Sequence, residues 1–353
     1  MDLENEKGID TSNSQCKNCG SGLFFDPKSK GLKCKNCSSV FDFEKSILNQ
    51  KKELVASNTE NDNWSMEARV FQCDTCAAKI IVTGYDVTTV CPYCGSAYVS
   101  KTDQLPGLKP DRVVPFNYDE KEAVGVFAKG VKKKFFVPRV FKKEIPESNV
   151  RGLLVPTFTF DVNTFSTYSG ILEKITTVRD SKGNTKRKVD RFNISGSNSL
   201  DFVDLVIESS SKFDNKQMSS ILPYDMSQGY KFNENFLRGY SVEHYQDSLD
   251  ECHRSAKAIV DSNIRSSVLS GYDYTNVVSL NISTDYKNEK YTYCLLPVDT
   301  FEYEYKKKKY ITIMNGQTGK IGKGLPISPL KVSLVVILVI LVISSIFLLA
   351  ALA

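Results

Sequence analysis

The chain has 353 residues, with 46 Lys and Arg against 41 Asp and Glu, a formal net charge of +5 and ten cysteines. Every charged residue lies at or before Lys331, and residues 332–353 hold 16 Val, Leu, Ile or Phe with three Ala and three Ser. A helix of about 20 apolar residues can cross the hydrocarbon core of a bilayer. The sequence therefore excludes a simply soluble protein and predicts a transmembrane helix over 332–353.

The chain begins with a polar segment, Met1–Asp10, that has neither the basic flank nor the apolar core of a secretory signal. Lys320, Lys323 and Lys331 precede the apolar span, and basic residues tend to stay on the cytoplasmic side of a membrane. We therefore expect a single-pass, tail-anchored protein of the inner (cytoplasmic) cell membrane, with its N-terminal head in the cytoplasm.

Eight of the ten cysteines form four Cys-x2-Cys pairs, and the second set of two pairs repeats the first after 57 positions. Such self-similarity indicates a duplicated unit. Zinc takes four thiolates tetrahedrally, and two residues between cysteines allow one tight turn to present both sulfurs to it. We predict two Zn2+ ions in closed zinc ribbons, with these ligands: Cys16, Cys19, Cys34 and Cys37 for the first ion, and Cys73, Cys76, Cys91 and Cys94 for the second.

Two other uses of these cysteines are weaker. Disulfides require an oxidising compartment, which a cytoplasmic head would not meet, and a redox pair is normally a single Cys-x-x-Cys. Closed zinc sites leave no coordination position open for catalysis. Units of about 30 residues bury too little apolar surface to fold alone, so the metal should supply much of their folding free energy. Gly20 and Gly95, each directly after a cysteine pair, are expected to adopt positive φ.

The central region mixes two periodicities. Helical spacing of apolar residues predicts helices over Asp119–Val131 and Tyr240–Arg265, and a shorter helix near Ile47–Val55. Strands are predicted over Leu153–Tyr168, Ile171–Val178, Phe192–Ile194, Phe202–Ile207, Val277–Ile282, Tyr291–Val298, Phe301–Tyr305 and Tyr310–Met314. Strands outnumber helices without strict alternation, which favours an α+β fold: two N-terminal ribbons, a β-rich central domain with at least two helices, and one transmembrane helix.

We expect the following division of the chain: a polar tail (1–14), ribbon 1 (15–43), a partly helical linker (44–68), ribbon 2 (69–100), a hinge (101–112), the central domain (113–325), a juxtamembrane segment (326–331) and the transmembrane helix (332–353).

Two basic segments stand out. Lys306–Lys309 joins two predicted strands and is interpreted first as a solvated hairpin tip, and Arg179–Arg191 carries six basic and two acidic residues and is interpreted first as a mobile loop. The alternative for both is contact with anionic lipid headgroups or an acidic partner, since each basic residue near such a surface contributes about 1 kcal/mol. The candidate contact residues are Lys306, Lys307, Lys308, Lys309, Lys186, Arg187 and Lys188.

Signals for catalysis are weak. His253 follows Cys252, but neighbouring residues on a helix point in different directions and do not meet. The segment Asn315–Lys320, NGQTGK, lacks the full phosphate-binding pattern and is better interpreted as turns. We therefore expect no catalytic residues, no small-molecule substrate and no enzyme activity.

The charge distribution also disfavours a nucleic-acid-binding protein. Two zinc ions and eight thiolates would lower the formal charge of the head from +5 to about +1. Nucleic-acid binding usually requires a concentrated basic surface. Ribbon 1 alone comes near to one, with five lysines against two aspartates: Lys17, Lys28, Lys30, Lys33 and Lys35 against Asp26 and Asp42.

Three segments resemble a family of bacterial membrane-anchored zinc-ribbon proteins of the transcription-factor-IIB type: VVPF (Val113–Phe116), LLVPTFTFD (Leu153–Asp161) and LLPVDTFEYEYKKKKYITIMNGQTGKIGKGLPISPLK (Leu295–Lys331). The chain departs from that pattern at Thr157–Thr159 and Asp299, where members often carry tryptophan. The resemblance covers most of the chain. It implies zinc ribbons, a closing hydrophobic helix and a place in membrane-stress systems with flotillin-like or phage-shock-type partners.

These observations favour a tail-anchored zinc-ribbon adaptor, or scaffold, that recruits cytoplasmic proteins to the membrane in an envelope-stress response. Tethering raises local concentration, so weak ribbon contacts can act together. The alternative hypothesis is a membrane-tethered nucleic-acid-binding regulator that uses ribbon 1 and the basic 179–191 segment.

Overall fold

The protein is an α+β molecule with one long curved sheet. The computed structural model describes residues 15–48, 51–54, 69–82, 91, 93, 99–101, 107–143, 150–179, 185–210, 212–213 and 215–352. Within these residues the chain forms four α-helices, α1 (Glu120–Lys133), α2 (Asn215–Ile221), α3 (Leu249–Ser270) and α4 (Pro329–Leu352). The α+β class predicted from the sequence is confirmed.

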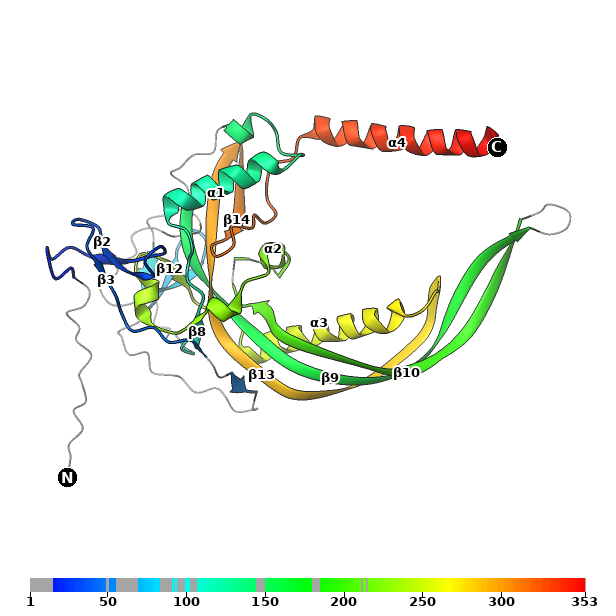
Figure 1. Cartoon of the computed structure of the whole chain (residues 1–353), viewed down its shortest axis with the longest axis horizontal. Coiled ribbons are helices and arrows are strands. Elements are labelled where there is room, and N and C mark those ends of the chain that lie inside the picture. Colours follow the sequence, from blue (N-terminus) through cyan, green and yellow to red (C-terminus); the bar gives the residue numbers. More distant parts are fainter. Residues whose placement is uncertain are drawn as a thin grey trace, which may run out of the picture.

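Three long antiparallel strands form the frame of the molecule: β9 (Val150–Arg179), β10 (Thr185–Glu208) and β13 (Asn276–Tyr305). β9 lies between β13 and β10, and the strands curve together along the length of the molecule (Figure 1). α3 lies on the concave side of this sheet (Figure 1). Its apolar face packs there, with these side chains buried: Cys252, Ala256, Val260, Ile264 and Val268.

The sequence divided these three strands into seven shorter ones, and that division is wrong. The polar stretch 285–290 resembles a turn, yet it continues β13 through a bulge between Lys287 and Lys290. Gly170 also resembles a break, but an ideal Cβ there would lie 2.4 Å from the Ser279 carbonyl oxygen. Glycine is therefore needed because β13 approaches β9 closely. Long-range pairing extends these strands through residues whose local signal is weak.

The helix predicted over Tyr240–Arg265 begins later, at Leu249. Residues Ser241–Glu243 form β12, which pairs with β9 on one side and with β6 (Lys79–Val82) on the other. Ser248 caps α3: its Oγ accepts a hydrogen bond from Glu251 N, and Glu251 Oε2 accepts one from Ser248 N at 2.8 Å. The capping box therefore fixes where the helix starts.

The helix predicted over Asp119–Val131 is confirmed as α1. Asp119 is its N-cap and forms a capping box with Glu122. Ala123, Phe127 and Val131 are buried, and the Phe127 ring stacks on Phe301 of β13 with 3.7 Å between ring centroids.

The linker between the ribbons is not helical where the structure describes it, at 44–48 and 51–54. Lys52–Glu53 form β4, which pairs with Tyr291 and Lys290 of β13. Lys51, expected on a helical face, instead forms ion pairs at 2.7 Å with Asp161 and 2.8 Å with Asp204. Pairing with a distant strand outweighs the weak local helical pattern.

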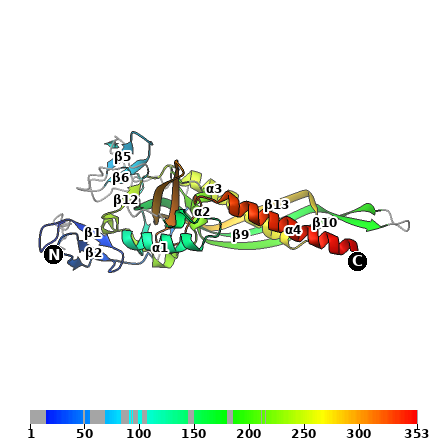
Figure 2. The same cartoon turned by 90° about the horizontal axis from the view of Figure 1, so that it is seen from above.

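The remaining strands build the two ribbons and the end of the main sheet. Ribbon 1 has its own sheet of β1 (Leu23–Asp26), β2 (Gly31–Cys34) and β3 (Val40–Phe41). The main sheet also contains these strands: β5 (Arg69–Cys73), β7 (Val99–Lys101), β8 (Arg112–Val113), β11 (Tyr230–Lys231) and β14 (Lys308–Asn315). Both ribbons lie at one end of the elongated molecule, and the far ends of β9 and β10 lie at the other (Figure 2).

α4 confirms the apolar C-terminal helix. Its stretch Pro329–Phe347 has a mean hydropathy of 2.8, and none of that stretch is buried inside the protein. The helix is long and apolar enough to cross a membrane. It begins at Pro329, three residues before the predicted start, because proline fits the first turn of a helix.

Candidate metal centres

The first cysteine cluster combines four sulfurs from two turns of ribbon 1. The Sγ atoms of Cys16, Cys19, Cys34 and Cys37 all lie within 4.8 Å of one another. Cys16 and Cys37 are 3.5 Å apart at Sγ, and Cys19 and Cys34 are 3.4 Å apart. Four thiolates around a tetrahedral zinc at about 2.3 Å would lie about 3.8 Å from one another. The cluster could therefore hold one metal ion with little rearrangement.

The second cluster repeats this arrangement in ribbon 2. The Sγ atoms of Cys73, Cys76 and Cys91 lie within 4.8 Å of one another, with 3.7 Å between Cys76 and Cys91. The fourth predicted ligand, Cys94, lies outside the described residues. Three sulfurs at this spacing could hold a metal ion and leave a corner for one more ligand.

The turns of the two ribbons share their hydrogen bonds. Gly20 N donates to Cys16 O at 2.8 Å, and 57 positions later Ala77 N donates to Cys73 O at 2.8 Å. The cysteine N–H groups also donate across their turns, Cys16 to Ser21 O at 2.7 Å and Cys73 to Ala78 O at 2.9 Å. The repeat seen in the sequence is therefore a repeat of backbone geometry.

The residue after each described cysteine pair adopts a left-handed conformation. φ is +73° at Gly20, +60° at Ser38 and +58° at Ala77. The expectation for Gly20 is confirmed, whereas Gly95 lies outside the described residues. Because Ser38 and Ala77 accept the same φ, the turn itself requires this conformation, and glycine only makes it easier.

Local hydrogen bonds favour the thiolate in the first cluster. Ser39 lowers the pKa of Cys37 to about 6 through its hydroxyl and its backbone. The backbone N–H groups of Cys37 and Asn36 point at Cys34 Sγ, at 3.5 and 3.4 Å, and lower the pKa of that thiol as well. Because the thiolate is the form that binds metal, this donor set fits a divalent cation such as Zn2+.

Ribbon 1 is seated on the central domain by aromatic side chains. Phe25 of β1 is buried and lies 5.2 Å from Phe236, ring centroid to centroid. Phe43 contacts the same Phe236 ring at 5.1 Å. Phe25 N also donates to Arg238 O at 3.0 Å. The ribbon therefore shares a hydrophobic core with the head.

Two lysines of ribbon 1 are committed to the same interface. Lys30 Nζ donates to Phe116 O at 2.8 Å and to Asn117 Oδ1 at 2.7 Å, and burial lowers the pKa of Lys30 to about 8. Lys28 Nζ lies 2.9 Å from Glu122 Oε1. These side chains are therefore part of the interface, which reduces the basic surface that ribbon 1 could offer to an acidic partner.

Ribbon 2 is joined to the main sheet through β12 and through contacts to its cysteine turns. Arg151 of β9 donates to Cys91 O at 2.8 Å, and Lys212 donates to Cys76 O. Tyr93, two residues after Cys91, lies 5.7 Å from the Phe213 ring. Sequence reasoning missed Arg151 and Lys212 because each lies at least 60 positions from its partner and belongs to no local motif.

The candidate contact residues fall in two distant places. Lys306 and Lys307 form the tip of the β13–β14 hairpin, with φ of +52° and +61°, and Lys308 and Lys309 begin β14. The segment 185–191, expected in a loop, is instead part of β10, where it pairs with 173–179 of β9. Lys186, Arg187 and Lys188 therefore lie at the opposite end of the long strands from the hairpin tip (Figure 1).

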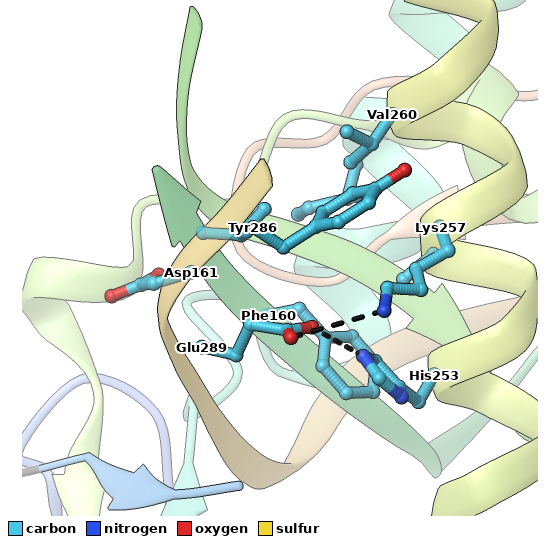
Figure 3. A pocket seen from close by; sticks show the side chains of 10 residues that line it. Phe160, Asp161, His253, Lys257, Val260, Tyr286 and Glu289 are labelled. Atoms are coloured by element: carbon cyan, nitrogen blue, oxygen red, sulfur yellow. Dashed lines mark hydrogen bonds and ion pairs between the residues drawn. The ribbon is translucent and has the colours of Figure 1, made fainter. Parts of the chain in front are cut away.

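A small pocket lies between α3 and the long strands (Figure 3). His253 Nε2 is 2.6 Å from Glu289 Oε2, and Lys257 Nζ is 3.8 Å from Glu289 Oε1. Lys257 also lies 4.3 Å from the centre of the Tyr286 ring. The charged groups compensate one another and tie α3 to the bulge of β13, so the pocket is best explained as a structural contact.

Cys252 and His253 diverge as expected for neighbours on a helix. Cys252 Sγ points at Glu208 O, 4.0 Å away, whereas His253 faces Glu289. Burial raises the pKa of Cys252 to about 12, which keeps it as an unreactive thiol.

The NGQTGK segment is a buried turn. Asn315 Nδ2 donates to Ile221 O at 2.9 Å, and its Oδ1 accepts from the backbone of Gln317 and Thr318, both at 2.9 Å. Gly319 has φ of +73°. The polar groups are used to hold α2 against β14, so the interpretation as a turn is confirmed.

Fold and site together define a protein with an α+β head, two ribbon-type cysteine clusters and an apolar helix suited to a membrane. The chain is 31% identical over 323 residues to the uncharacterized protein YdjG of Bacillus subtilis (strain 168), which covers 90% of this chain and 91% of YdjG. It therefore belongs to the same protein family as YdjG. No protein-family model matches the chain, and no solved structure matches it.

Proposed function

We propose that the protein is a membrane-anchored zinc-ribbon adaptor that recruits other proteins to the inner face of the cell membrane. Its head would lie in the cytoplasm, α4 would span the bilayer, and each ribbon would carry one structural Zn2+. The resemblance to bacterial zinc-ribbon proteins of the transcription-factor-IIB type makes envelope stress the setting we propose, with flotillin-like or phage-shock-type partners.

The separation of the two ends of the molecule carries this proposal. The cysteine clusters lie at one end of the head, and α4 leaves the head at a distance from them (Figures 1 and 2). Cys19 and Cys37 are exposed although the ribbon is firmly seated. A ribbon held rigidly and away from the membrane helix suits a docking surface, because little conformational freedom would be lost when a partner binds.

The zinc ions would be structural in this proposal. The ligands are Cys16, Cys19, Cys34 and Cys37 in ribbon 1, and Cys73, Cys76, Cys91 and Cys94 in ribbon 2. Four thiolates fill the tetrahedral coordination of zinc. The metal would then fix the shape of each ribbon and supply folding free energy. We propose no enzyme activity.

The test is affinity capture of partners from membranes with the full chain and two ligand variants, Cys16→Ser and Cys73→Ser. We expect each variant to lose one zinc and to capture fewer of the proteins bound by the unmodified chain. Cys252→Ala is the matched control, because it removes a buried thiol outside both clusters. Unchanged capture by both ligand variants would reject the adaptor function.

A nucleic-acid-binding function is disfavoured by the contacts of the basic residues. Lys28 and Lys30 face the head, and at the far end of the strands Lys188 pairs with Asp190 at 2.9 Å and Arg191 with Glu173 at 3.0 Å. Binding of DNA or RNA by the full chain at low salt, weakening steeply as salt rises, would favour this alternative.

A further inference from the structure

A patch of exposed apolar side chains surrounds the start of α4. The exposed fractions are 58% for Phe135, 43% for Phe136, 56% for Val140, 65% for Ile327 and 83% for Leu330. Three of these residues lie in the turns after α1, and two lie at the start of α4. We name these five residues the collar. Contiguous apolar side chains on a surface mark a contact site.

Hydrogen bonds fix the collar to the first turn of α4. Lys331 Nζ donates to Phe135 O at 2.7 Å and to Val137 O at 2.9 Å, and Ser328 N donates to Phe136 O at 2.8 Å. The Lys331 ammonium also lies 5.4 Å from the centre of the Phe135 ring. The collar therefore lies directly beside the point where the apolar helix leaves the head.

Two basic segments that are far apart in the sequence meet around the collar. Phe141 packs against Tyr303 and Tyr305 near the tip of the β13–β14 hairpin, at 4.6 and 5.9 Å between ring centroids. Lys306 lies 5.7 Å from the Tyr305 ring. This packing gathers ten basic residues: Lys132, Lys133, Lys134, Arg139, Lys142, Lys143, Lys306, Lys307, Lys308 and Lys331. The described acidic residues of segments 132–143 and 301–310 are Glu302 and Glu304.

We propose that the collar lies in the headgroup layer of an anionic phospholipid bilayer, with its apolar side chains at the boundary of the acyl chains and the surrounding basic side chains on lipid phosphates. The proposal rests on α4 spanning the membrane. Aromatic and apolar side chains flanked by lysines are typical of proteins that contact a membrane surface. The excess of positive charge suits anionic lipids. The apolar surface is also continuous with α4, which favours lipid over a protein partner.

This contact also sets how α4 would leave the head. The far ends of β9 and β10 and the C-terminal end of α4 lie on the same side of the molecule (Figure 1). Those strand ends carry exposed charged side chains, which cannot enter hydrocarbon at low cost. With the collar on the headgroups, α4 would turn away from the strands at segment 324–328, which begins with Gly324 at φ +112°.

The test uses tryptophan fluorescence of the full chain in liposomes of phosphatidylglycerol and phosphatidylcholine. F135W places a tryptophan in the collar, V203W places one at a 72% exposed position of β10, and L341W places one within α4. Emission from the unmodified chain, whose single tryptophan is Trp64, is subtracted. Brominated lipids carry the quencher at chosen depths in the bilayer.

We expect the F135W tryptophan to lose most of its emission to bromines near the headgroups, more so as phosphatidylglycerol increases, and the V203W tryptophan to keep its emission. If L341W is quenched and F135W behaves like V203W, the collar does not contact lipid although the anchor stands. If L341W is not quenched, the anchor itself is wrong and the collar proposal falls with it. Shielding of F135W from aqueous acrylamide without lipid quenching would assign the collar to a protein and overturn the lipid contact.

Discussion

The Nζ atom of Lys30 in ribbon 1 lies 2.7 Å from Oδ1 of Asn117 in the central domain, 87 positions further along the chain. The same ammonium donates to the carbonyl oxygen of Phe116. Ribbon 1 is therefore locked onto the head by a buried donor as well as by the Phe25 contacts. This relationship makes the ribbon an integral part of the head.

Replacing this donor should weaken the attachment of ribbon 1. Lys30→Met removes two hydrogen bonds from a charged donor, and hydrogen bonds to charged groups contribute about 1.5–3 kcal/mol each. Because burial already disfavours the charge of Lys30, we expect the lower end of that range for the loss in free energy of unfolding. Urea unfolding measures it. Lys35→Met, at an exposed position of the same ribbon, should change stability little, and equal effects of the two variants would contradict the contact.

Removing single ligands should act on one ribbon at a time. In Cys16→Ser and Cys73→Ser we expect about half of the zinc of the unmodified chain, because a hydroxyl is a poor replacement for a thiolate ligand. Elemental analysis of the purified full chain gives the ratio. Cys294→Ala is a second thiol control outside the clusters, since Cys294 is fully buried in β13. A Cys294 variant with reduced zinc would show that the metal lies elsewhere.

Two glycines should respond in opposite ways to the same substitution. Gly170→Ala places a Cβ 2.4 Å from Ser279 O, so the sheet must shift and the protein should lose stability. Gly125 lies in α1 with open space around it, and Gly125→Ala should raise stability by about 0.5–1 kcal/mol. Thermal unfolding of both variants tests the long continuous β9. A Gly170→Ala variant as stable as Gly125→Ala would mean that β9 and β13 do not approach as described.

Asp299 should make stability depend on pH. Burial, with a further contribution from Glu120, raises the pKa of the Asp299 carboxyl well above its usual range. The folded state therefore keeps a proton that the unfolded state loses above about pH 4, so this group's contribution to stability falls as pH rises. We expect Asp299→Asn to be more stable than the unmodified chain at pH 8, with a smaller difference at pH 5. Asp201→Asn, at an exposed carboxyl, serves as control, and a pH-independent difference for Asp299→Asn would contradict the assignment.

Local chemistry explains which parts of the fold and site could be predicted. The capping residues Asp119 and Glu122 and the spacing of Phe127 and Val131 mark α1 within one turn of chain. The spacing of the cysteines likewise predicts both clusters, because each turn is local and the ligands repeat. The apolar composition of 332–353 is sufficient to predict α4.

The elements that sequence reasoning missed depend on distant partners. β4 and β12 form because β13, β6 and β9 offer them open edges. The full length of β13 crosses the polar stretch 285–290, which by itself resembles a turn. The collar could not be predicted either, because the segments that contain Phe135 and Lys306 meet only through packing of Phe141 on Tyr305. No local pattern encodes such contacts.

The central claim is that the protein carries two metal-filled ribbons on a head held at a membrane by α4. The most direct measurement is the zinc content, per chain, of the full-length protein recovered from alkali-washed membranes. The account predicts two zinc ions per chain in that fraction. Protein without zinc, or protein that the wash releases from the membranes, would contradict it.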